Sequence, residues 1–220
     1  MSPRALARWF AGVAVAGLLA ACAIGPRSVP EDRAAAWTDL RGRLEALDGW
    51  RAEGRLSVHT RDDGGQANFT WIERPDGSFR LRLAGPWGQS AARLSGRAGS
   101  AELVAADGMR YVGADARDLL AGLYGWDIPV SGLRHWLVGL PGESSEYTLD
   151  RFGRLATLRW KGWRIEYKRY RPMGKLDLPA VLIAARPETG TEVRVAVDAW
   201  SPRGGGPAPV PESPVPLIGG

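Results

Sequence analysis

The chain has 220 residues, with 29 Lys or Arg against 24 Asp or Glu, and its formal net charge of +5 comes from scattered arginines, which does not indicate a nucleic-acid-binding tail. The single cysteine excludes a fold held by internal disulfides, so folding must depend on an apolar core. The two histidines, His59 and His135, lie far apart with no partnering cysteine, which argues against a zinc site.

The first predicted element is an export signal at the N-terminus. A short basic region with Arg4 and Arg8 precedes an uncharged apolar run from Trp9 to Leu19, and small residues follow. The alternative, a membrane-spanning helix, needs about 18–20 apolar residues, and this run is shorter even when it is counted from Trp9 to Ile24. Residues 1–21 are therefore interpreted as a signal peptide, whose removal lowers the net charge to +3.

The lone cysteine lies where the apolar run ends, in the segment Leu19-Ala20-Ala21-Cys22. This segment resembles the lipobox of bacterial lipoproteins, in which the signal is cut before the cysteine and the cysteine is acylated. The resemblance implies that Cys22 is a lipid anchor and that residues 22–35 tether the folded part to a membrane. Ala23 follows Cys22 in place of aspartate, which by the same resemblance favours the outer membrane.

The folded part, residues 36–200, is predicted to begin with one helix and to continue as strands. Up to Asp48-Gly49 the apolar residues recur at helical steps of three and four. These residues are Trp37, Leu40, Leu44 and Leu47. The period then changes to two from Trp50 to His59, and turns rich in Gly and Asp lead into further alternating runs around 67–71 and 79–83. One face of these runs is apolar and the other charged, which predicts an antiparallel meander.

The stretch LAGPWGQSA, residues 83–91, reads as a turn between two strands that carries an indole at its tip. Turns are normally polar, so Trp87 needs a reason to be there. An indole is favourable at the headgroup boundary of a bilayer, and Pro86 and Gly88 would fix a protruding turn. We therefore expect Trp87 and Pro86 to contact the membrane. The alternative is that the loop folds back and the indole packs on the rim of the domain.

Residues 115–140 depart from the strand pattern. Two short helices are predicted, one ending at Gly125 and one that contains Leu133 and is closed by Gly139 and Pro141. Shorter strands are predicted before this segment, and five more follow it. They lie at 89–95, 101–106, 109–112, 145–149, 155–160, 163–170, 180–186 and 191–198. The tail 201–220 is rich in Pro and Gly and is predicted to be disordered.

About eleven evenly spaced strands favour a curved sheet or an incomplete barrel. A barrel of about eight strands is just filled by its own side chains, so eleven strands would enclose additional space that a helix could cover. The side chains of the ten tryptophans would form part of the wall of such a cavity, although for any single tryptophan an ordinary core position is the simpler interpretation. The predicted cavity residues are Trp50, Leu56, Phe69, Trp71, Leu81, Leu83, Trp163, Ile165 and Tyr167, with Trp136 and Leu137 as lid residues.

No catalytic site is predicted. The chain has no Gly-rich phosphate loop ending in Lys-Ser/Thr and no Gly-x-Ser-x-Gly elbow. Acidic residues such as Glu53, Glu73 and Glu166 are scattered among arginines on strand faces, as solvated pairs would be. We therefore expect no enzyme activity, no metal and no cofactor. Arginine with tryptophan can indicate single-stranded nucleic acid, but an exported lipoprotein does not meet that ligand.

Several stretches of the chain resemble the LolB family of outer-membrane lipoproteins. The matching stretches are Trp50–Val58, Phe69–Trp71, Leu81–Pro86, Ala106–Gly108, Ile128–Val130, Leu133–Pro141 and Gly162–Tyr167. Each is weak alone, but their order, their spacing and the lipobox make the resemblance fairly specific from about residue 37 to 200. The Pro/Gly tail after Trp200 is a departure, and Trp87 stands where the family usually has leucine or another apolar residue.

The resemblance implies an incomplete eleven-stranded barrel with a helical lid over a hydrophobic cavity. It also implies a receptor on the periplasmic face of the outer membrane that takes acylated lipoproteins from a soluble carrier of LolA type and inserts them into the bilayer. Each acyl chain costs about 10 kcal/mol or more in water, at about 0.8 kcal/mol per methylene, so cargo cannot diffuse freely. With no ATP-binding motif, transfer must depend on relative affinities. We expect a monomer. The alternative is an envelope lipoprotein that binds a small lipid or scaffolds an outer-membrane assembly.

Overall fold

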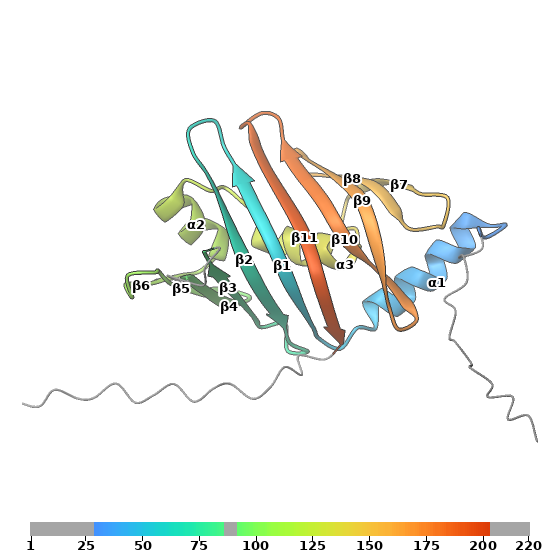
Figure 1. The fold of residues 1–220 in the computed structure, drawn as a ribbon, viewed down its shortest axis with the longest axis horizontal. Coiled ribbons are helices and arrows are strands. Elements are labelled where there is room, and N and C mark those ends of the chain that lie inside the picture. Colours follow the sequence, from blue (N-terminus) through green and yellow to red (C-terminus); the bar gives the residue numbers. More distant parts are fainter. Residues whose placement is uncertain (1–28, 86–91, 203–220) are drawn as a thin grey trace, which may run out of the picture.

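The computed structural model describes residues 29–85 and 92–202, which form an 11-stranded antiparallel sheet with three helices (Figure 1). The strand order is β6-β5-β4-β3-β2-β1-β11-β10-β9-β8-β7. The strands β6 and β7 form the two edges and do not pair with each other in the described sheet, so the sheet is not closed into a barrel. The prediction of an incomplete barrel of about eleven strands with helices is confirmed.

The helices and strands occur along the chain in the predicted order. The helices are α1 (Arg33–Glu45), α2 (Ala116–Tyr124) and α3 (Val130–Val138). The strands are β1 (Trp50–His59), β2 (Gly64–Glu73), β3 (Phe79–Ala84), β4 (Ala92–Arg97), β5 (Ser100–Val104), β6 (Arg110–Gly113), β7 (Glu146–Leu149), β8 (Leu155–Trp160), β9 (Trp163–Met173), β10 (Leu176–Arg186) and β11 (Thr191–Pro202).

Local signals explain where the helices begin and end. The side chain of Asp32 accepts hydrogen bonds from the backbone N–H groups at the start of α1, and Asp115 does the same for α2. The helices α2 and α3 end at Gly125 and Gly139, both with positive φ, which glycine adopts without a Cβ penalty. The two predicted helix ends in the middle of the chain are thus confirmed.

The strands β9 and β10 are longer than the sequence predicted. Strand β9 ends at Met173, whereas the predicted strand ended at residue 170. Strand β10 begins at Leu176, whereas the predicted strand began at residue 180. Each added stretch contains a proline, Pro172 or Pro179, which lacks a backbone N–H donor for the sheet. The sheet accommodates Pro179 at a register shift, where the ladder is irregular in any case.

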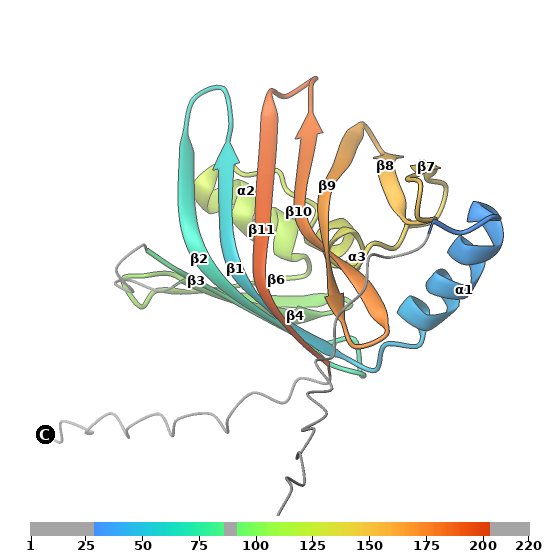
Figure 2. The same ribbon diagram turned by 45° about the vertical axis from the view of Figure 1, so that its right-hand side comes forward.

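The helices divide between two places on the sheet. In both views α2 and α3 lie against one face of the sheet, whereas α1 lies at the side formed by β7 to β10, away from β3 to β6 (Figures 1 and 2). Helix α1 packs through Trp37, Leu40 and Leu44, and the indole N–H of Trp37 donates to the hydroxyl of Tyr147 at 3.1 Å. None of the helices in the part of the chain that the structure describes is long and apolar enough to cross a membrane.

Candidate functional site

The candidate site is the concave face of the sheet, which α2 and α3 cover. The structure places all the predicted cavity and lid residues in or against one continuous apolar core. Leu56 and Leu83 are half-buried, and the other predicted residues are buried. They come from β1, β2, β3, β9 and α3, so the fold brings together side chains that the sequence could group only by alternation.

One end of this face is built from aromatic rings. Trp71 of β2 lies between Trp50 of β1 and Phe79 of β3, with ring centroids 5.9 Å and 5.6 Å away. Trp50 also meets Trp200 of β11 edge-on at 5.4 Å. The rings therefore join four neighbouring strands into one rigid apolar wall.

A second aromatic cluster attaches α3 to the sheet. Trp136 of α3 is fully buried and packs against Trp163 of β9 at 5.6 Å and Trp160 of β8 at 5.9 Å. Gly132 makes this approach possible, because a Cβ there would lie 3.0 Å from the Trp136 ring and 3.1 Å from the Trp160 ring. The predicted lid residue Trp136 is thus a core contact in this closed arrangement.

Tyr167 of β9 brings a polar atom into the apolar face. Its side chain is buried, and its hydroxyl has no hydrogen-bond partner among the described residues. Burial raises the pKa of this phenol, so it stays protonated and able to donate. The neighbouring Tyr170 stacks on it at 5.9 Å but donates its own hydroxyl to the carbonyl of Leu155 at 2.7 Å. Tyr167 can therefore donate to a carbonyl of a bound ligand.

A buried ion pair fixes α3 to β2. Glu73 accepts hydrogen bonds from the guanidinium of Arg134 and from the indole N–H of Trp71, the latter at 3.3 Å. Only 7% of Glu73 is exposed, which corrects our interpretation of it as a solvated carboxylate. The alternation of β2 contained the signal, because Glu73 has the same parity as Phe69 and Trp71. Glu53 and Glu166 pair with Arg51 and Lys168 at the surface, as expected.

The pKa of Glu73 rises because burial penalises its charged form, although Arg134 opposes this effect. Arg134 also lies over the ring of Phe79, 5.8 Å from the centroid. Its side chain lines a pocket of about 310 Å³ on one side and a pocket of about 140 Å³ on the other. The Glu73–Arg134 pair thus stands between two hollows at the margin of the covered face.

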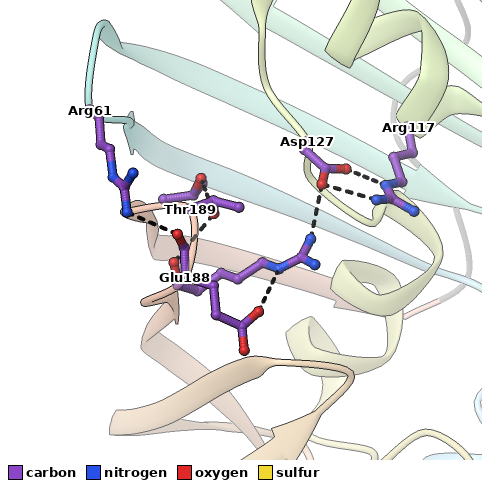
Figure 3. A network of polar contacts seen from close by, with 7 residues as sticks. Arg61, Arg117, Asp127, Glu188 and Thr189 are labelled. Carbon is purple, nitrogen blue, oxygen red and sulfur yellow. Dashed lines mark hydrogen bonds and ion pairs between the residues drawn. The ribbon is translucent and has the colours of Figure 1, made fainter.

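A second polar network holds the segment between α2 and α3 to the hairpin turns (Figure 3). Asp127 accepts from Arg117 of α2 and from Arg186 at the end of β10, the latter at 2.9 Å. The hydrogen bond from Arg117 and its charge lower the pKa of Asp127. Arg61, in the turn after β1, donates to the backbone carbonyl of Glu188 at 2.9 Å. Sequence reasoning missed this network, because its members are far apart along the chain.

Three predicted site residues lie outside the described residues, namely the lipid anchor Cys22 and the loop residues Pro86 and Trp87. The predicted signal peptide, the first half of the tether and nearly all of the tail lie outside them as well. His59 and His135 are exposed, and no group of His, Cys, Asp and Glu within residues 29–85 and 92–202 could hold a metal ion.

Comparisons with known proteins agree with this geometry. A family model described as outer membrane lipoprotein LolB matches residues 48–200. The outer-membrane lipoprotein LolB of Pseudomonas fluorescens is 35% identical over 191 residues, which cover 84% of this chain and 92% of that protein. The protein of the same name from Pseudomonas putida is 37% identical over 169 residues, which cover 76% and 81%. A DUF1329 family protein from Desulfovibrio piger shares the fold alone, with a TM-score of 0.51 and 10% identity over 78% of this chain and 93% of that chain.

Proposed function

This chain belongs to the LolB family of outer-membrane lipoproteins, and we propose that it receives acylated lipoproteins from a periplasmic carrier of LolA type and inserts them into the outer membrane. The observation that carries the proposal is the apolar concave face of an unclosed sheet, covered by a helical segment and not by further strands. In a closed barrel an acyl chain can enter only at an open end. Here the apolar face of the sheet becomes accessible when the covering helices move.

The covering segment is attached by polar contacts at two places. The Glu73–Arg134 pair fixes α3, and the Asp127 network fixes the connection between α2 and α3. Acyl chains enter when these ion pairs and hydrogen bonds break and the helices move away from residues such as Leu81 and Ile165. The chains leave again for the bilayer, where burial is at least as favourable. Transfer therefore needs no covalent step, and the protein acts as a localisation factor and not as an enzyme.

A photoreactive fatty-acyl probe tests the acyl site. We expect light to attach the probe to peptides from the inner face, and excess lipoprotein–carrier complex to prevent this labelling. A tryptophan in place of Ile165 would fill the face and reduce labelling, whereas the same change at the exposed Arg194 serves as a control. Labelling confined to outer-face residues would favour the alternative of a scaffold with a permanently filled core.

In this proposal Cys22 is the lipid anchor, and Trp87 and Pro86 contact the bilayer. The mature chain should begin at Cys22 and carry acyl mass, which mass spectrometry measures, and Cys22→Ala should leave the fold intact. The variant Trp87→Glu should accept cargo from the carrier normally but should insert it poorly into liposomes, because a carboxylate opposes entry into the apolar layer. Trp87→Leu is the matched control and should insert cargo well. Normal insertion by the Glu variant would exclude a membrane role for this side chain.

A further inference from the structure

The outer face of the β3–β4 hairpin carries an unusual concentration of positive charge. Arg80 and Arg82 of β3 and Arg93 and Arg97 of β4 are exposed and share the strand parity that faces away from the helices. Arg82 lies directly opposite Arg93, and Arg80 lies opposite Ser95, which is two residues from each arginine of β4. Arg82 and Arg93 therefore place two positive charges opposite each other on the outer face of the sheet.

The protein supplies little negative charge to this face. Within the described residues, none of Arg80, Arg82 and Arg97 forms an ion pair with a carboxylate, unlike Arg55, which pairs with Asp198 at 3.4 Å. Glu102 of β5, which lies opposite Ser95 on this face, is already bound by Arg110. These three guanidinium groups are therefore available to an external anion.

An apolar side chain is exposed on the same face as these arginines. The register runs across the outer face from Arg80 to Ser95, Glu102 and Val112, so Val112 shares this face, and 71% of it is exposed. The strands β3 to β6 lie on the side of the molecule away from α1 (Figures 1 and 2). Arginines next to exposed apolar side chains are typical of surfaces that bind at a lipid headgroup layer.

We propose that this outer face binds the phosphate groups of anionic phospholipids in the membrane. The name arginine face is used below for Arg80, Arg82 and Arg97, with Val112 at its margin. The proposal rests on the proposed function, because it concerns the bilayer into which cargo is inserted. A phosphate diester accepts hydrogen bonds from a guanidinium in a planar, paired geometry, which suits the exposed side chains of Arg80, Arg82 and Arg97. The arginine face would thus orient the receptor on the bilayer independently of the lipid anchor.

Vesicle binding by the chain without residues 1–22 tests the proposal, since this chain keeps every described residue and lacks the anchor. We expect it to sediment with vesicles that mix phosphatidylglycerol into phosphatidylcholine, to bind pure phosphatidylcholine weakly, and to lose binding at high salt. The double variant Arg80→Gln, Arg82→Gln should weaken binding about tenfold or more, and Arg80→Lys, Arg82→Lys should retain most of it. Val112→Asp should also weaken it.

The matched control removes the same charge from the outer face elsewhere. Arg55→Gln, Arg194→Gln changes two exposed arginines of β1 and β11, and binding should stay within about twofold of the unmodified chain. Equal losses in the two double variants would overturn the proposal, because net charge alone would then explain binding. It would also be overturned if the Arg80/Arg82 variant bound vesicles normally but no longer received cargo from the carrier in solution, since the arginine face would then dock a protein.

Cargo delivery is measured separately with the unmodified, anchored protein. If the arginine face binds anionic vesicles but no lipoprotein is delivered, the proposed function fails and the lipid-binding site stands. If delivery is normal while the arginine variants bind vesicles as the unmodified chain does, the lipid-binding site fails and the proposed function stands.

Discussion

The two helices that cover the concave face are attached to it in different ways. In α3 the buried residues are Val130, Gly132, Leu133, Trp136, Leu137 and Val138, whereas in α2 they are only Ala116 and Leu120. The ion pair of α3 is formed with the buried Glu73, whereas that of α2, between Arg117 and Asp127, is about half and one-third exposed. Helix α3 is therefore part of the core, and α2 is a peripheral cover.

This difference indicates which part of the cover should move first. Segments with few buried apolar contacts open at a lower free energy than the core does. The sequence predicted lid residues on α3, Trp136 and Leu137, and both are buried. We infer that α2 and the residues up to Asp127 withdraw before α3 does. Four changes test this order.

The largest expected effect is at Trp136. Its replacement by alanine removes the ring that packs between α3 and the Trp160–Trp163 hairpin, so the free energy of unfolding should fall by about 3–5 kcal/mol. In α2 the corresponding change Leu123→Ala should cost less than about 0.5 kcal/mol, because Leu123 is 36% exposed. Urea denaturation measures both, and equal losses would contradict the comparison.

Arg134→Met should destabilise the protein by about 2 kcal/mol at about pH 7, less than for a fully buried pair because Arg134 is partly exposed. The pKa of Glu73 is raised above its ordinary 4.5, so ionising it destabilises the fold as the pH rises through that raised value. Without Arg134, ionisation of Glu73 destabilises the fold by a larger free energy. Denaturation at about pH 4 should therefore show a smaller loss than at about pH 7, and a loss independent of pH would exclude Glu73 as its cause.

Asp127→Asn should cost about 1 kcal/mol or less, because its ion pairs are partly exposed. Its pKa is lowered, mainly by the hydrogen bond from Arg117, so the stabilisation is complete above the ordinary value of 3.8 and is lost as the pH falls through the lowered value. Hydrogen exchange should become faster in α2 while α3 stays protected. Faster exchange in α3 as well would show that the two helices open together.

The smallest expected effect is at Gly122, an exposed helical position of α2 where an added Cβ meets nothing within 4 Å. Gly122→Ala should stabilise α2 by about 0.5 kcal/mol and slow the uptake of an acyl probe. Gly42→Ala is its match in α1, where a Cβ also meets nothing. The two variants should be equally stable, and only the change in α2 should slow uptake. Equal rates of acyl-probe uptake by the two variants would show that α2 does not control entry of the acyl chain.

Much of the fold could be predicted because its signals are local. The alternation of apolar and polar residues identified the strand faces. Gly125 and Gly139 marked the ends of α2 and α3, and both have a positive φ in the structure. The strand ends near Pro172 and Pro179 could not be predicted, because whether a sheet tolerates a proline depends on its partner strand.

The polar contacts of the site were harder to predict. Glu73 could have been assigned to the inner face from its parity with Trp71, but its partner Arg134 lies on a different element. The network of Asp127 with Arg117 and Arg186 depends on the way the α2–α3 connection crosses the hairpin turns, which no short-range pattern encodes.

The unclosed sheet leaves two strand edges with backbone groups that could pair with another molecule. Such edges can template intermolecular β-pairing, and a protein concentrated on a membrane would be especially exposed to this hazard. Both edge strands, β6 and β7, are only four residues long, and each begins with an exposed charged residue, Arg110 and Glu146. Brevity and charge make each edge a poor template for a further strand. The sheet can therefore remain open between β6 and β7 without promoting association of molecules through its edge strands.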